Sequence, residues 1–83
     1  MKITAHRDTS KPAFNAWRVE FQMEWDDTLS NELPLYDRGL DLSYEPLQEA
    51  GCDVTNKYAD VDYWLERGNP DKGWGVLVFL FTF

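Results

Sequence analysis

The chain has 83 residues, of which 43% are apolar and 16% aromatic, with fifteen acidic and eight basic residues and a formal net charge of −7. This length suits a single domain, residues 1–83, and leaves no room for a second hydrophobic core. The apolar and aromatic content is typical of a folded protein and excludes a disordered chain.

The negative charge is concentrated in residues 20–62, which hold twelve acidic and only two basic residues, a formal charge of −10. Phosphates would be repelled by such a surface, which argues against direct binding to nucleic acid or to anionic lipid. Cys52 is the only cysteine, and the chain shows no secretory signal and no apolar run of membrane-spanning length. We therefore expect a soluble protein of the cytoplasm.

The first half of the chain shows several local patterns. Residues 2–7 suit a short strand, and residues 8–12 a turn into residues 17–26, which alternate strictly between apolar and polar. Residues 33–36 are expected to be extended, on an edge or in a loop because of Pro34. Residues 40–45 alternate again and predict a second one-sided strand, after which Pro46 opens a short helix that Gly51 ends.

Residues 54–67 fit two structures. Val54, Tyr58, Val61 and Leu65 recur at helical spacing, which favours a helix. The alternative is a hairpin strand, because residues 59–65 also alternate and residues 69–73 suit a tight turn. Residues 73–83 are apolar on both faces, as in a central strand; burial against another chain is the alternative. Together these elements predict an α+β fold, a mostly antiparallel sheet of four or five strands with one or two helices packed on it.

The residue types of catalysis and metal binding are sparse. We interpret His6, the only histidine, as a surface residue and Cys52 as a small buried or half-buried one, so no nucleophile–base pair is expected. No glycine-rich phosphate loop and no Cys/His cluster is present. The Asp26–Asp27 and Asp60–Asp62 pairs lack the ligand pattern of a calcium loop. We expect neither an enzyme nor a metal or cofactor site.

The acidic region suggests a surface for a basic partner. The acidic candidates for this contact are Glu20, Glu24, Asp26, Asp27, Asp37, Asp41, Glu45 and Glu49. Those from Asp37 onward recur every four residues, but Gly39, Pro46 and Gly51 interrupt the segment. We therefore expect local pairs and not one stripe. The aromatic candidates interleaved with the acids are Tyr36, Tyr44, Tyr63 and Trp64, whereas Trp17, Trp25 and Trp74 are assigned to the core by their phase.

In size, charge and lack of catalytic residues the chain resembles the small acidic inhibitors of phages and toxin operons, such as anti-restriction, anti-CRISPR and nuclease-immunity proteins. These inhibitors share no single fold and no motif found here, so no functional residue carries over from them. The resemblance implies a stoichiometric inhibitor that binds a basic, nucleic-acid-handling protein by occlusion or nucleic-acid mimicry. The alternatives are a structural or assembly subunit, which the C-terminal apolar strand suggests, and a sugar- or ligand-binding domain with exposed tryptophans. The oligomeric state, monomer or dimer, stays open.

Overall fold

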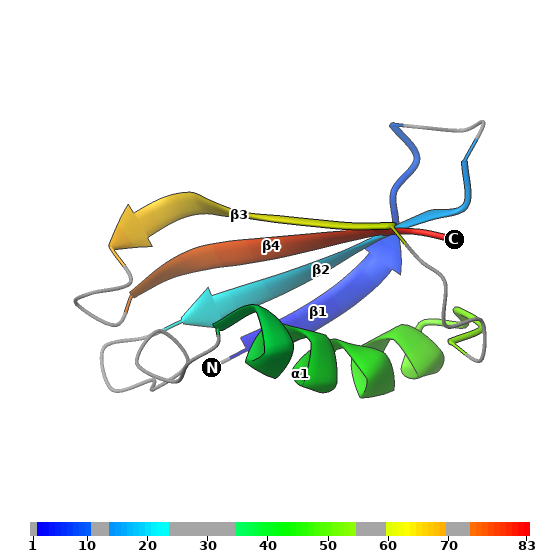
Figure 1. Cartoon of the computed structure of the whole chain (residues 1–83), viewed down its shortest axis with the longest axis horizontal. Helices are drawn as coiled ribbons and strands as arrows, with labels where there is room; N and C mark the ends of the chain where they lie inside the picture. Colours follow the sequence, from blue (N-terminus) through cyan, green and yellow to red (C-terminus); the bar gives the residue numbers. More distant parts are fainter. Residues whose placement is uncertain (1, 11–13, 24–34, 55–59, 70–73) are drawn as a thin grey trace.

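The computed structural model describes residues 2–10, 14–23, 35–54, 60–69 and 74–83. Their elements, in chain order, are β1 (Lys2–Arg7), β2 (Ala16–Met23), α1 (Leu35–Glu49), β3 (Asp60–Asn69) and β4 (Trp74–Thr82). The four strands form one antiparallel sheet in the order β1-β2-β4-β3. Figure 1 shows α1 lying along one face of this sheet, and most of its contacts are with β1 and β2. The α+β fold expected from the sequence is confirmed.

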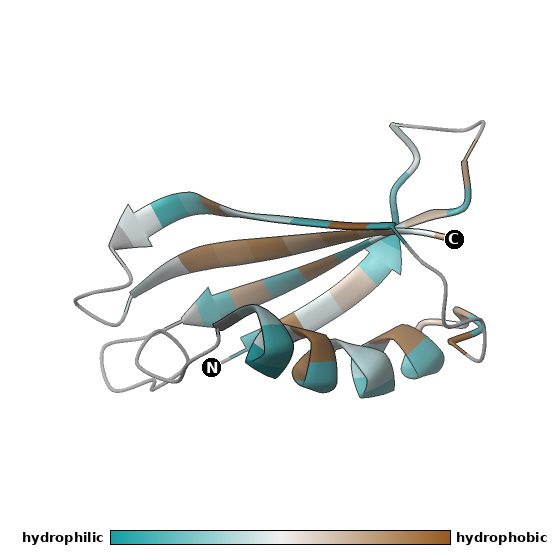
Figure 2. Ribbon diagram, in the orientation of Figure 1, coloured by the Kyte–Doolittle hydropathy of each residue, from teal (hydrophilic) through white to brown (hydrophobic). Residues whose placement is uncertain are grey.

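The hairpin β1–β2 and the central strand β4 agree with the sequence patterns. Lys2 pairs with Gln22 at one end of the hairpin and Arg7 with Trp17 at the other. β4 is hydrogen-bonded to β2 on one side and to β3 on the other, and residues 75–81 are buried. Figure 2 shows how continuously apolar this strand is. Its two-sided burial explains why its sequence does not alternate.

β3 is a strand, so for residues 60–67 the favoured helix is wrong and the alternative, a hairpin strand, is correct. Residues 55–59 of this segment lie outside the described residues. Val61, Tyr63 and Leu65 lie on the same face of the sheet as α1, as their alternation indicates. Two glycines, Gly68 of β3 and Gly75 of β4, bring these strands close together. A Cβ on Gly68 would overlap the backbone of Gly75, and both have positive φ angles, 105° and 137°.

The structure of residues 35–49 differs from the sequence interpretation. The expected strand over residues 40–45 and the expected extended segment at Leu35 and Tyr36 are both helical, and Pro46 lies inside the helix, not at its start. Burial overrides local preference here, because this segment packs Leu40 and Leu47 against the sheet. Residues 33 and 34 lie outside the described ranges.

Gly51 ends the helix, as predicted. Its φ of 97° is the left-handed conformation that glycine adopts without strain. Its N–H donates to the carbonyl of Gln48 at 3.1 Å, and the N–H of Cys52 donates to the carbonyl of Leu47 at 2.9 Å. This pair of bonds is a Schellman motif, and the contact between Cys52 and Leu47 in the core completes it.

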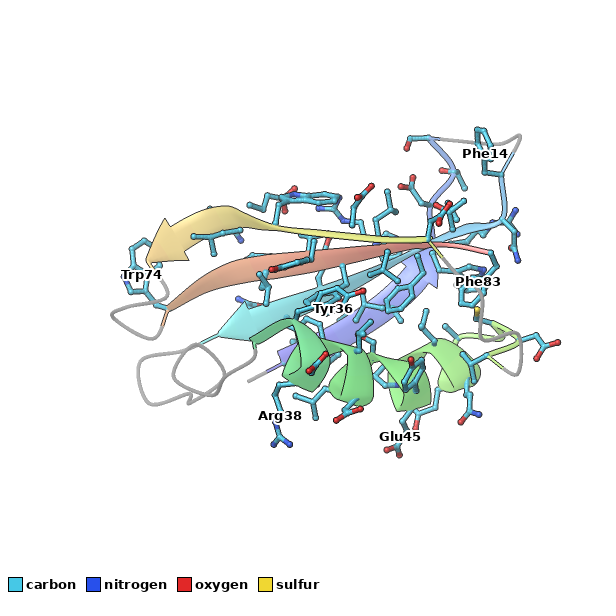
Figure 3. The ribbon with its side chains drawn as sticks, in the orientation of Figure 1. Phe14, Tyr36, Arg38, Glu45, Trp74 and Phe83 are labelled. Carbon is cyan, nitrogen blue, oxygen red and sulfur yellow. The ribbon has the colours of Figure 1, made fainter. Side chains whose placement is uncertain are left out.

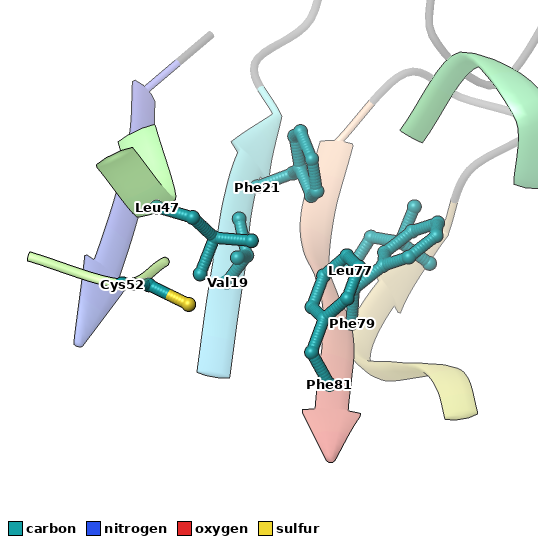
Figure 4. Close-up of a cluster of buried hydrophobic side chains, with 7 residues drawn as sticks. All are labelled: Val19, Phe21, Leu47, Cys52, Leu77, Phe79 and Phe81. Carbon is teal, nitrogen blue, oxygen red and sulfur yellow. The ribbon is translucent and has the colours of Figure 1, made fainter. Parts of the chain in front are cut away.

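The core lies between α1 and the sheet (Figure 4). Its buried members are Val19, Phe21, Leu47, Cys52, Leu77, Phe79 and Phe81. Cys52 is buried, as expected, and Trp17 packs against this cluster. Trp74 is 47% exposed, so its assignment to the core is wrong, and Trp25 lies outside the described residues. Phe79 is at the centre, with Phe21 edge-on at 5.5 Å between ring centroids.

Candidate protein-binding surface

The outer side of α1 carries four exposed carboxylates, which we call the acidic stripe: Asp37, Asp41, Glu45 and Glu49. Residues four apart are neighbours on a helix, about 6 Å apart along its axis, so the stripe extends over about 18 Å. Because α1 is continuous from Leu35 to Glu49, the expectation that Gly39 and Pro46 prevent a single stripe is wrong.

The fold places these carboxylates outward by filling the inner side of α1. Ser43 is fully buried there, and its hydroxyl donates to the carbonyl of Gly39 at 2.6 Å. Gly39 leaves room for the ring of Phe79, so the helix lies close to the sheet. Figure 3 shows Arg38 and Glu45 pointing away from the sheet. The charged side of α1 is therefore fixed in orientation by tight packing on its other side.

Repulsion between the carboxylates of the acidic stripe lowers the stability of α1. Asp37, in the first turn, interacts favourably with the helix dipole. Glu49 lies at the negative end of the dipole, and the last turn holds no basic residue. Within the described part of the chain, no ion pair involves any carboxylate of the stripe. Three like-charge pairs, each four residues apart, and a carboxylate in the last turn therefore lower the stability of α1, and the attraction between Arg38 and Asp41, three residues apart, offsets part of this.

Tyr44 extends this surface with an aromatic side chain. It is 45% exposed and is adjacent to Glu45 in the chain, as the sequence interpretation expected. A tyrosine has a large apolar ring at a small cost in side-chain entropy and carries a hydroxyl that can form a hydrogen bond. The outer side of α1 thus combines four negative charges, and one positive charge from Arg38, with an aromatic group that can be desolvated.

Glu20 lies on the far face of the sheet, opposite α1, and is not part of the acidic stripe. Arg18 donates to Glu20 through Nε at 2.7 Å and to Glu66 through Nη2 at 2.6 Å. The two hydrogen bonds, the one with Glu66 first, raise the pKa of the Arg18 guanidinium above its ordinary value. The guanidinium lies 5.8 Å from the ring of Trp64. The charge of Glu20 is thus compensated within the chain.

The remaining residues expected to bind a partner are dispersed. Tyr36 and Tyr63 pack on each other, with ring centroids 5.1 Å apart, and both stack on Phe79, although Tyr63 stays 47% exposed. Trp64 lies on the far face. Glu24, Asp26 and Asp27 lie outside the described residues. The structure therefore brings together the four acids of the stripe and Tyr44, and separates Glu20, Tyr63 and Trp64 from them.

The far face holds features that sequence reasoning did not single out. Next to the end of β2, a shallow hollow of about 250 Å³ is lined by Gln22, Arg67, Trp74, Gly75 and Val76. The Arg18–Glu20 pair could have been found in the sequence, because residues two apart on a strand share a face. The contributions of Glu66 and Trp74 depend on strand pairing, for which the sequence carries no local signal.

The described residues contain no arrangement typical of nucleophilic catalysis or of a metal centre. His6 lies on the far face, where its ring Nε2 is 4.0 Å from Glu20, while Cys52 lies in the core on the face covered by α1. Burial is the main cause of the raised pKa of the Cys52 thiol, with the charge of Asp53 second. In the described ranges, no group of three or more His, Cys, Asp or Glu side chains could hold a metal ion.

Comparisons with known proteins give no further constraint. No protein-family model matches the chain, and neither the curated proteins nor the solved structures include a match. Among the described residues, no helix has the length and apolar character needed to cross a membrane.

Proposed function

We propose that this protein is a stoichiometric inhibitor that binds a basic, nucleic-acid-handling protein through the acidic stripe. The observation that carries this proposal is the stripe itself, four carboxylates along one side of a single helix, all exposed to solvent. Inhibition follows from occupation of a site on the partner that otherwise holds nucleic acid, and it involves no turnover.

The geometry of the acidic stripe supports mimicry of a nucleic-acid backbone. Its charges repeat about every 6 Å along the helix axis, a separation close to that of successive phosphates along one strand. Lysine and arginine side chains that neutralise phosphates would meet carboxylates at similar intervals. Charges arranged in this way raise the rate of association and orient the two proteins, and the rate falls as salt screens them.

Hydrogen bonding within the chain distinguishes Glu20 from the acidic stripe. Glu20 is hydrogen-bonded to Arg18, and a partner's cation would compete with that bond. The stripe carboxylates form no ion pair within the described residues, so binding to a basic surface breaks no such bond. The proposed contact therefore centres on Asp41, Glu45 and Tyr44, and not on Glu20.

A pull-down with two matched variants tests this proposal. The stripe variant combines Asp41→Lys and Glu45→Lys. The control variant combines Asp60→Lys, Thr4→Lys and Gln22→Lys, which makes the same change in net charge at exposed positions off α1. Tagged proteins are incubated with bacterial lysate, washed at low and high salt, and eluted with DNA or RNA, and the bound proteins are identified by mass spectrometry.

The proposal expects a basic nucleic-acid-binding protein that the wild type and the control variant retain and the stripe variant loses. High salt and added nucleic acid should release it. Circular dichroism must show that all three proteins are folded. Equal retention by the stripe variant, or equal loss by both variants, would show that the position of these charges does not matter and would contradict the proposal.

The hollow on the far face supports a second candidate, a small-ligand or sugar-binding domain. Trp74 is 47% exposed beside the hollow, and Arg67 and Gln22 supply polar groups there. Sugars stack on exposed tryptophans, so binding would change tryptophan fluorescence. Unchanged fluorescence across a panel of glycans would remove this candidate. The assembly alternative loses its original support, because β4 is paired on both sides within the chain.

A further inference from the structure

The outer edge of β3 has the properties of a pairing surface. β3 is the terminal strand of the sheet, ten residues long, and among the described residues only β4 pairs with it. Three consecutive residues on it are large, apolar and exposed: Tyr63 at 47%, Trp64 at 37% and Leu65 at 39%. An edge strand with unpaired backbone groups and apolar side chains is a template for another strand. The other edge strand, β1, has six residues and no exposed large hydrophobic residue.

A bulge in β3 places opposite charges on the same face. Leu65 and Arg67 pair with Leu77 and Val76, two consecutive residues of β4, so Glu66 is the additional residue. Counted along the sheet, Arg67 is therefore two positions beyond Trp64, and Asp62 is two positions before it. Both charged residues lie with Trp64 on the far face of the sheet. Neither has an ion-pair partner among the described residues.

We propose that β3 pairs antiparallel with β3 of a second copy of this chain, about a two-fold axis that passes through Trp64. In this register Asp62 lies opposite the partner's Arg67, and the two-fold axis generates the same ion pair a second time. Tyr63 lies opposite the partner's Leu65 on the other face, and the two Trp64 side chains are neighbours. The two sheets become one continuous sheet of eight strands, and the apolar edge is no longer exposed.

The charges favour this register over its neighbours. An axis at Asp62 would place two carboxylates opposite each other. An axis at Tyr63 would place Arg67 opposite the partner's Asp60 but leave Asp62 opposite the partner's Trp64. The axis at Trp64 pairs Asp62 with Arg67 at the centre of the contact, and places no like charges opposite each other. Charged residues on an edge strand discourage pairing with unrelated strands. A two-fold pairing also consumes both β3 edges, so the assembly closes as a dimer. This inference does not depend on the proposed inhibitory function.

Charge reversal tests the register on the intact chain. Sedimentation equilibrium over micromolar concentrations measures the dimer dissociation constant of the wild type and of Asp62→Arg, Arg67→Asp and the double variant. Each single reversal replaces two opposite-charge pairs by two like-charge pairs, so we expect the dissociation constant to rise roughly ten-fold or more. The double variant restores opposite charges across the axis and should recover most of the wild-type affinity.

Two matched charge changes away from β3 and from the acidic stripe serve as controls. The pair Thr4→Lys with Gln48→Lys, and Lys2→Asp on β1, change the net charge by the same amounts at exposed positions. Both should leave the dissociation constant within about two-fold, as expected for distant sites. Circular dichroism checks that every variant is folded. A wild-type protein that stays monomeric at high micromolar concentration would overturn the inference. The inference would also be overturned if the dissociation constants of the single-reversal variants were no higher than those of the controls. The same holds if the double variant dimerised as weakly as the single ones.

Discussion

Gly39 provides a stringent test of how α1 packs on the sheet. Its substitution by alanine adds one methyl group, which would stabilise an exposed helix site by about 1 kcal/mol. In this structure that methyl would lie within 3 Å of three ring carbons of Phe79, closer than such atoms approach. The ring is fully buried and stacks on Tyr36, Tyr63 and Phe81, so it has no space into which to move.

The net effect follows from the two opposing contributions. Overpacking of a filled core costs about 1–3 kcal/mol, and the rigid surroundings of Phe79 place this site at the upper end. After the gain in helix propensity, Gly39→Ala should lower the free energy of unfolding by about 1–2 kcal/mol. For a domain of this size that corresponds to a fall in Tm of roughly 4–16 °C.

Urea unfolding followed by circular dichroism measures this change, and a double-mutant cycle identifies its cause. Phe79→Leu removes the part of the ring that the new methyl would meet, although it is destabilising in itself. In that background Gly39→Ala should be neutral or stabilising by up to about 1 kcal/mol, because only the propensity contribution remains. Stabilisation by Gly39→Ala in the wild type, or the same loss in both backgrounds, would refute the close packing of α1 on Phe79.

Three further predictions concern the ends of α1 and its surroundings. Glu49→Lys should raise the free energy of unfolding by about 1 kcal/mol, because it replaces a repulsion from Glu45 by an attraction and suits the helix dipole; urea titrations should show the gain shrinking as salt rises. Gly51→Ala should lower the free energy of unfolding by about 1 kcal/mol, because alanine is strained at a φ of 97° even though no atom would clash with its methyl group. An unchanged urea midpoint would contradict this. Burial raises the pKa of the Cys52 thiol above its unfolded value. The stability that the neutral thiol contributes is therefore present below about pH 8.5 and is lost as pH rises through the folded-state pKa. This loss of stability should be absent in Cys52→Ala.

The strands could be predicted where their patterns are local. β2 alternates from Trp17 to Met23 and β4 is apolar from Trp74 to Phe81, and each pattern indicates how many faces of the strand are covered. β3 was harder, since Val61 and Leu65 are four residues apart and also fit one face of a helix. What decides the matter is the pairing of β3 with β4, a contact between different parts of the chain.

The helix α1 could not be predicted from the sequence, because its residues suit packing against the sheet and not an isolated helix. Gly39 and Pro46 indicate breaks in an isolated segment, and Leu40, Leu42 and Tyr44 alternate as in a strand. In the folded chain Gly39 is where the ring of Phe79 fits, a reason that depends on β4. The acidic stripe was missed for the same reason, since its four carboxylates align only if the helix continues through both residues.

The placement of charge on α1 calls for a cause beyond folding. A helix selected for stability would carry cations in its last turn, whereas α1 has Glu49 there and like-charged neighbours at every step of the stripe. Solubility requires net charge but not a particular position for it. The stripe variant and its matched control have the same net charge, so they separate these causes. We expect both variants to stay soluble, and the stripe variant to be more stable than the wild type but unable to bind. That result would show that the position of these charges serves binding to a partner and lowers the stability of the fold.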